Sequence, residues 1–149
     1  MAGGFNKENI MADFTAFNAY MVSKDNLKRF EADGIKLGYD FYVKYPTYRG
    51  AYLCNIMELE FQVDDQVIPN DQIRFGVNGK WFLLSEIPEA NKEYWFTGAK
   101  ATIRVLDDGA LEPGEHKVYM RMLHKIPYTG YFGNYLNITS TCTQMLSID

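Results

Sequence analysis

The sequence has few of the residues from which most catalytic metal sites are built: its 149 residues include only two histidines and two cysteines. His116 and His124 lie eight residues apart in one alternating segment. On an extended strand they are about 26 Å apart at about 3.3 Å per residue, so they cannot share a metal ion. A metal-dependent cupin-type site, which needs a cluster of imidazoles, is therefore not expected. Cys54 and Cys142 are more typical of reduced thiols than of a disulfide framework, and a bond between the two is the alternative.

Long apolar runs and a surplus of positive charge are also missing. No apolar run approaches the roughly 18 residues of a membrane span. The net charge of −4 gives no electrostatic reason to expect nucleic acid or an anionic membrane as a partner. The N-terminus, MAGGFNKENIMADF, has no basic start followed by an apolar block, so no signal peptide is predicted. We therefore expect a cytoplasmic protein.

Motifs for nucleophilic or nucleotide chemistry are absent as well. There is no G-x-S-x-G and no glycine-rich loop before a helix. The paired carboxylates Asp64-Asp65 and Asp107-Asp108 could suggest a glycosidase, but both pairs lie in predicted turns, where aspartate is favoured for local hydrogen bonding. Glu58 and Glu60 share the predicted solvent face of one strand. As an independent enzyme, the chain shows no recognisable catalytic set.

What the chain does have is alternation of apolar and polar residues with a period of two. It is clearest at 35–45 and at 111–126, where four residues face one way: Val118, Met120, Met122 and Ile126. Similar segments at 57–63, 73–77, 81–84, 99–105 and 136–148 are separated by turn signals, among them Asn78-Gly79 and Glu112-Pro113-Gly114-Glu115. Met57, Leu59, Phe61 and Val63 are expected on the core face of their strand. Eight to ten short strands with no convincing helix predict an all-β, single-domain antiparallel β-sandwich, with a small barrel as the alternative.

The first part of the chain has a weaker pattern. Residues 1–17 show no clear period and are predicted to form an N-terminal arm, followed by the β-sandwich domain at 18–149. Short strands are predicted at Ala19–Val22 and Leu27–Phe30, on either side of a turn. The alternative for this region is a short helix over Lys24–Ala32.

Two connections, 45–52 and 127–135, are unusually aromatic. Tyrosine and arginine are enriched in protein–protein hot spots, because they bury a large area and keep a polar group. We therefore predict that these loops contact a partner or lie near an active site. The alternatives are that the rings cap the core, or that they stack on a small ligand such as a sugar. The candidate residues are Tyr45, Pro46, Tyr48, Arg49, Tyr52, Pro127, Tyr128, Tyr131 and Phe132.

The order of several short motifs resembles a known family over about residues 34–130. The motifs are Gly38-Tyr39-Asp40-Phe41, Tyr45-Pro46-Thr47-Tyr48-Arg49-Gly50, Val63-Asp64-Asp65, Val67-Ile68-Pro69, Ile73-Arg74-Phe75, Asn78-Gly79-Lys80 and Leu111-Glu112-Pro113-Gly114-Glu115-His116. In this order and spacing they resemble the β subunit of bacterial C-glycoside deglycosidases. Singly they are mostly turn motifs, so their order and spacing together carry the resemblance.

The resemblance implies a small β-sandwich subunit that forms a hetero-oligomer with a catalytic α subunit containing a sugar-isomerase-like TIM barrel. The α subunit would hold a divalent metal, typically manganese, and the catalytic histidine, so neither a cofactor nor a catalytic residue is expected in this chain. Such a complex is a carbon–carbon lyase of C-glucoside metabolism. It cleaves the bond between a 3-oxo-glucosyl group and an (iso)flavonoid-type aglycone by β-elimination. This chain would stabilise and complete the α subunit; the alternative from another class is a carbohydrate-binding module.

Overall fold

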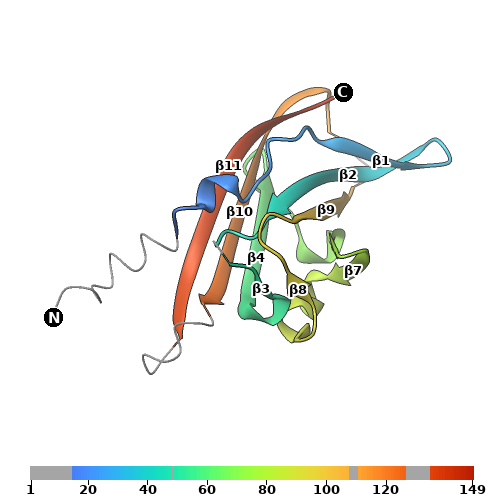
Figure 1. Cartoon of the computed structure of the whole chain (residues 1–149). Coiled ribbons are helices and arrows are strands. Elements are labelled where there is room, and N and C mark those ends of the chain that lie inside the picture. Colours follow the sequence, from blue (N-terminus) through green and yellow to red (C-terminus); the bar gives the residue numbers. More distant parts are fainter. Residues whose placement is uncertain (1–14, 48, 108–110, 127–134) are drawn as a thin grey trace.

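The computed structural model describes residues 15–47, 49–107, 111–126 and 135–149, and strands predominate in them (Figure 1). Their eleven strands form three antiparallel sheets, with the orders β1-β2-β9-β6-β7, β11-β10-β4-β5 and β3-β8. The strands are β1 (Lys28–Ala32), β2 (Ile35–Lys44), β3 (Ala51–Tyr52), β4 (Ile56–Val63), β5 (Gln66–Val67), β6 (Ile73–Val77), β7 (Lys80–Leu83), β8 (Tyr94–Trp95), β9 (Lys100–Leu106), β10 (Gly114–Ile126) and β11 (Leu136–Ile148). The prediction of an all-β fold is confirmed.

The described residues also form four short 3₁₀ helices: η2 (Asn18–Tyr20) precedes β1, while η3 (Leu53–Asn55), η4 (Asn70–Gln72) and η5 (Leu84–Glu89) connect strands. No helix in this part of the chain is long and apolar enough to cross a membrane. The described residues form eleven strands, against the eight to ten predicted, and β3, β5 and β8 have only two residues each.

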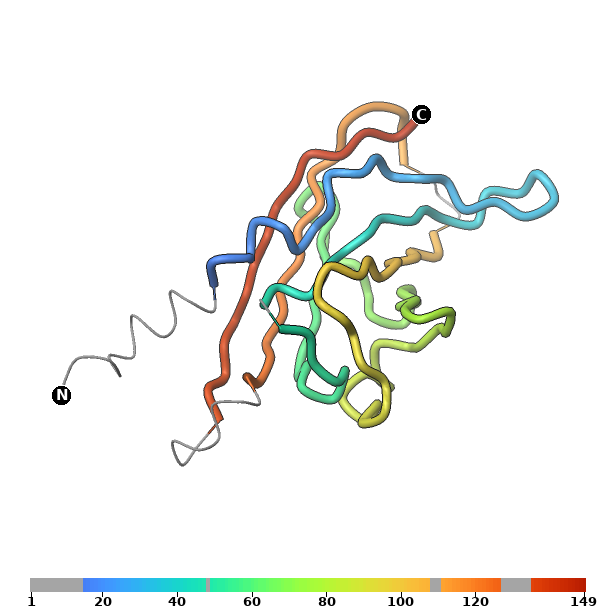
Figure 2. The backbone as a smooth tube through the Cα atoms, in the orientation of Figure 1, coloured from blue at the N-terminus to red at the C-terminus, as the bar shows by residue number. Residues whose placement is uncertain are grey.

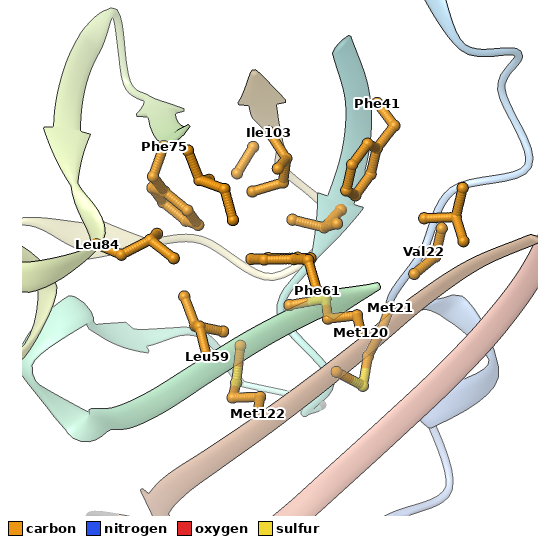
Figure 3. Packing of buried hydrophobic residues seen from close by; sticks show 14 of the residues in the cluster. Met21, Val22, Phe41, Leu59, Phe61, Phe75, Leu84, Ile103, Met120 and Met122 are labelled. Atoms are coloured by element: carbon orange, nitrogen blue, oxygen red, sulfur yellow. The ribbon is translucent and has the colours of Figure 1, made fainter. Parts of the chain in front are cut away.

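The core lies between the two larger sheets (Figure 3). Phe41 of β2 and Phe61 of β4 meet edge to face, with ring centroids 5.7 Å apart, and so join the two layers. The alternating residues of β10, among them Met120 and Met122, are buried, while the residues between them are partly exposed. Trp95 of the β3–β8 ribbon is fully buried and adds to the same core. Period-two burial in β10 confirms the predicted orientation of this strand.

Two turn predictions are confirmed where the chain reverses tightly, whereas the turn predicted at 112–115 is not formed as expected, because Gly114 and Glu115 already belong to β10 and pair with Ile148 and Ser147. Asn78 and Gly79 both have positive φ, at 54° and 76°, which is the type I′ conformation that joins β6 to β7. Asp64 and Asp65, at 51° and 67°, join β4 to β5 in the same way. The long strands β10 and β11 pair along their whole length, from Gly114↔Ile148 to Ile126↔Leu136, and run side by side in Figure 2.

One predicted face is wrong at the start of β4. The register with β10 passes from Leu123↔Glu58 to His124↔Ile56, so Met57 is an extra residue in a β-bulge. The bulge turns Met57 partly outward and places Ile56 in the core instead. Alternation in the sequence does not reveal such an extra residue, because the partner strand decides where it lies.

The predictions for the N-terminal region are partly wrong. Ala19–Val22 is not a strand: residues 18–20 form η2, and Val22 makes a single bridge to Val43. The amide of Lys44 donates to the carbonyl of Met21, and this contact with the end of β2 fixes the segment in place of a strand partner. Leu27–Phe30 overlaps β1, so the alternative helix over Lys24–Ala32 is also wrong. Most of the predicted arm at 1–17 lies outside the described residues, and its boundary stays a prediction.

Candidate functional site

Tyr45 and Pro46, at the start of the first aromatic loop, are buried. Tyr45 is 4% exposed, and its ring packs edge to face against Trp95 at 5.3 Å and His124 at 5.7 Å between centroids. The carbonyl of Thr47 accepts a hydrogen bond of 2.9 Å from the Thr97 hydroxyl. The packing of Tyr45 and the Thr97–Thr47 hydrogen bond therefore anchor the start of this loop to the protein. Tyr45 itself is a core residue.

The exposed part of this loop leads to three aromatic side chains that contact one another. Arg49 is exposed, and Tyr52 of β3 is 47% exposed. The ring centroid of Tyr52 is 5.1 Å from that of Tyr94, which is 4.8 Å from that of Phe96, itself 61% exposed. We call Tyr52, Tyr94 and Phe96 the aromatic ladder.

The backbone of the β3–β8 ribbon fixes the ladder. Tyr52 and Tyr94 are cross-strand partners, as are Ala51 and Trp95. The fully buried Trp95 donates a hydrogen bond of 2.8 Å from Nε1 to the carbonyl of Ala99, which anchors β8. A Cβ at Gly50 would overlap the carbonyl oxygen of Trp95, so only glycine allows the close approach of the two segments here. The position of the aromatic ladder is therefore set by the β3–β8 pairing and by the buried Trp95.

Sequence reasoning named Tyr52 as a candidate but missed Tyr94 and Phe96. The signal was present in Tyr94-Trp95-Phe96, where alternation directs the middle ring inward and the flanking rings outward. The pairing with Tyr52 was not visible, because 41 residues of chain lie between it and Tyr94.

The two aromatic loops begin at the same end of the molecule. His124, against which the Tyr45 ring packs, lies two residues before the end of β10, where the second loop starts. At the end of that loop, Tyr135 is half exposed, and the Lys125 Nζ lies 4.9 Å from the centroid of its ring. The remaining candidates lie outside the described residues, and their role stays a prediction: Tyr48, Pro127, Tyr128, Tyr131 and Phe132.

His124 is a neutral imidazole that packs against Tyr45 near the end of β10. It is fully buried, and its Nε2 lies 2.9 Å from the Ser140 Oγ on β11. Its Nδ1 has no hydrogen-bond partner among the described residues. Burial lowers its pKa from 6.5 to about 4, because no water solvates the charged form. At neutral pH this end of the core therefore carries no charge from His124.

His116 lies on the same face of β10 as His124, but its pKa is raised where that of His124 is lowered. Its Nδ1 lies 2.5 Å from the Asp64 Oδ2, and its Nε2 lies 2.6 Å from the carbonyl oxygen of Glu112. The hydrogen bond to Asp64 raises the pKa of His116. Burial alone would raise the pKa of Asp64, but hydrogen bonds from His116 and from the Lys117 amide outweigh it and hold that pKa below its usual range. The pair connects β10 to the β4–β5 turn, a structural role.

No group of three or more His, Cys, Asp or Glu side chains in the described ranges could hold a metal ion. Cys54 and Cys142 are both free thiols, so they do not form the alternative disulfide. The groups available for binding at this end of the molecule are the rings of the aromatic ladder and the guanidinium of Arg49.

Comparison with known proteins gives a consistent result. A family model described as C-glycoside deglycosidase beta subunit matches residues 17–128. A C-glycoside deglycosidase beta subunit of Eubacterium cellulosolvens is 37% identical over 79 residues, covering 53% of this chain and 54% of that protein. A 3'-dehydrocarminate deglycosidase beta subunit of Microbacterium sp is 27% identical over 132 residues, covering 89% of this chain and 96% of that protein. The chain thus spans about half the length of the first relative and almost all of the second.

Proposed function

Because the chain belongs to the C-glycoside deglycosidase beta subunit family, we propose that it is the accessory subunit of such an enzyme and docks on a catalytic α subunit through the aromatic ladder. The observation that carries the docking site is the ladder itself, three contacting rings at the end where both aromatic loops begin. Exposed aromatic clusters of this kind favour a protein partner.

The reaction follows from the proposed substrate class, a C-glycoside whose glucosyl group carries a keto group at C3. The keto group acidifies the proton at C2. Removal of this proton leaves an electron pair that forms the C1–C2 double bond, while the (iso)flavonoid-type aglycone leaves C1 with the bonding pair and is then protonated. In this proposal the α subunit, a sugar-isomerase-like TIM barrel with a divalent metal such as manganese, performs these steps. In this proposal none of these steps is assigned to this chain.

The contribution of this chain is binding and exclusion of water. The ladder rings are fixed by their edge-to-face contacts before binding, so docking costs little side-chain entropy. A docked β-rich subunit stabilises the α subunit and shields its site from water, which strengthens electrostatic interactions there. Arg49 is exposed in the same loop and adds a planar cation to the surface.

The geometry of the ladder favours a protein partner over a sugar. The planes of Tyr52 and Tyr94 differ by 85°, and those of Tyr94 and Phe96 by 62°, so the ladder presents ring edges and faces in several directions. Such a surface fits the uneven side-chain relief of a protein.

The test is co-expression with a candidate α subunit, a barrel-type protein of the proposed kind, followed by size-exclusion chromatography and a C-glycoside cleavage assay. We expect co-elution, and cleavage only when both chains are present. Phe96→Ala and Tyr52→Ala should each weaken the complex by about 2 kcal/mol, about 30-fold in Kd, as expected of hot-spot rings. Ile35→Ala is the matched control, because Ile35 is 62% exposed at the β1–β2 turn and far from the ladder.

Three results would contradict parts of the proposal. Separate elution of the two wild-type chains would refute the subunit function. Unchanged affinity in a Phe96→Ala/Tyr52→Ala double variant would refute the docking site alone. Affinity of the isolated chain for a sugar, lost in the same double variant, would support the carbohydrate-binding alternative instead.

A further inference from the structure

A groove of about 490 Å³ lies along one edge of β4. Residues Met57 to Glu60 of β4 line one side of it. Pro69, after β5, and Pro88, in η5, line the other side. The groove is open to solvent along the outer rim of the second sheet and is separate from the aromatic ladder.

The edge of β4 facing this groove has no strand beside it over most of its length in the described residues. β5 pairs with β4 only at Gln62↔Val67 and Val63↔Gln66. One further hydrogen bond follows, from the amide of Ile68 to the carbonyl of Phe61 at 2.9 Å. Pro69 then ends the pairing, because proline has no amide hydrogen to donate. Among the described residues, none pairs with 57–60 on this side, which leaves an open strand edge.

The direction of the backbone groups along this edge follows from the alternation of an antiparallel ladder. The carbonyl of Phe61 points toward β5, so the backbone groups of Leu59, two residues earlier, point toward the groove, and those of Glu60 point toward β10. Outside the strand ladders, none of the described residues forms a backbone hydrogen bond with Leu59. The Leu59 side chain is buried and points toward Leu84 in the core, which holds this stretch of backbone rigid (Figure 3).

The charges beside the edge identify the occupant that fits. Glu58 and Glu60 lie on the outer face of β4, and a single guanidinium, Arg121, lies 3.9 Å and 4.0 Å from their carboxylates. Two negative charges thus share one positive charge. If a second copy of this chain paired antiparallel about Leu59, Glu58 would lie opposite Glu60 of the copy, and like charges in that position are destabilising. A strand with basic side chains at alternate positions is complementary.

We propose that the free edge of β4 accepts an extended segment of the partner subunit as an added strand beside residues 57–60, with Lys or Arg facing Glu58 and Glu60. Strand addition uses the unpaired amide and carbonyl for affinity and the alternating side chains for specificity. The inference rests on the proposed function only in naming the α subunit as the source of the segment. Since η3 connects β3 to β4 directly, Tyr52 and the groove are close in the chain, and one partner can cover both.

Residue-resolved hydrogen–deuterium exchange on the free chain and on its complex with the α subunit tests this inference. The Leu59 amide should exchange at least about tenfold more slowly in the complex, since it gains a hydrogen bond. The Glu60 amide should change much less, because it is already bonded to β10. This residue-by-residue alternation distinguishes an added strand from simple covering of the surface.

Charge reversal provides a second readout. A Glu58→Lys/Glu60→Lys double variant should weaken the complex at least about tenfold. Glu115→Lys, at an exposed position on β10 of the same sheet, is the matched control and should leave affinity unchanged.

The outcomes separate this inference from the proposed function. If the complex forms with unchanged exchange at Leu59, or if the double variant binds normally, strand addition is refuted while the subunit function remains. If Leu59 is already protected in the free chain in a concentration-dependent manner, a second copy occupies the edge, and the proposal of an α-subunit segment is refuted. If no complex forms, both proposals fail.

Discussion

The buried imidazole of His124 should make the stability of this protein depend on pH in a defined window. Burial lowers its pKa from 6.5 to about 4 in the folded chain, whereas in the unfolded chain it returns to about 6.5. Between these values the unfolded state binds a proton that the folded state does not bind. The free energy of unfolding therefore falls as the pH falls from about 6.5 to about 4. At about 1.4 kcal/mol per pKa unit, the full loss is about 3 kcal/mol.

The assay is urea unfolding at a series of pH values from 7 to 4, on the wild-type chain and on His124→Gln. Glutamine keeps hydrogen-bonding groups but cannot take up a proton in this range. We expect the wild type to lose about 3 kcal/mol more than the variant over the window. A loss of that size is a large part of the usual 5–15 kcal/mol of a domain, so it should be readily measured.

Other titrating groups cancel in this comparison because both proteins contain them. His116 has a raised pKa, so its contribution is fully present below about pH 6.5 and is lost as the pH rises through its folded pKa. Asp64 has a lowered pKa, so its contribution is lost as the pH falls through its folded pKa. His116→Gln is the matched control and should keep the acid-side loss that His124 causes. Parallel pH curves for the wild type and His124→Gln, or an NMR titration of His124 near pH 6.5, would refute the reasoning.

Two further predictions concern the packing of the first sheet. Gly38→Ala should cost about 3 kcal/mol or more in the free energy of unfolding, because the new Cβ would overlap the carbonyl oxygen of Val105; Gly34→Ala, at positive φ but in open space, should cost only about 1 kcal/mol. Arg104→Leu should cost about 2–3 kcal/mol, because it removes both hydrogen bonds of 2.8 Å to the buried Asp40 carboxylate, and adding Asp40→Asn should restore part of this loss. Urea unfolding measures both effects. Equal costs for the two glycine variants, or no recovery in the double variant, would contradict the respective explanation.

The strand faces could be predicted wherever the pattern is local. In β10, the burial of Val118, Met120 and Met122 follows directly from alternation, and the same alternation places His124 in the core. The Asn78-Gly79 turn follows from the tolerance of both residues for positive φ. The bulge at Met57 does not follow, because the extra residue is defined only against Leu123 and His124 of the partner strand.

The same distinction between local pattern and strand pairing applies to the candidate site. The sequence by itself determined an all-β chain, two of its tight turns, the inward direction of alternate side chains and two aromatic connections, since each depends on the chemistry of neighbouring residues. Only the tertiary structure decided that Tyr45 is a core residue, that Tyr52 meets Tyr94 and Phe96, and that the edge of β4 is free. These features depend on which distant strands pair and in which register. That choice minimises the free energy of the whole core, and no single segment of the sequence specifies it.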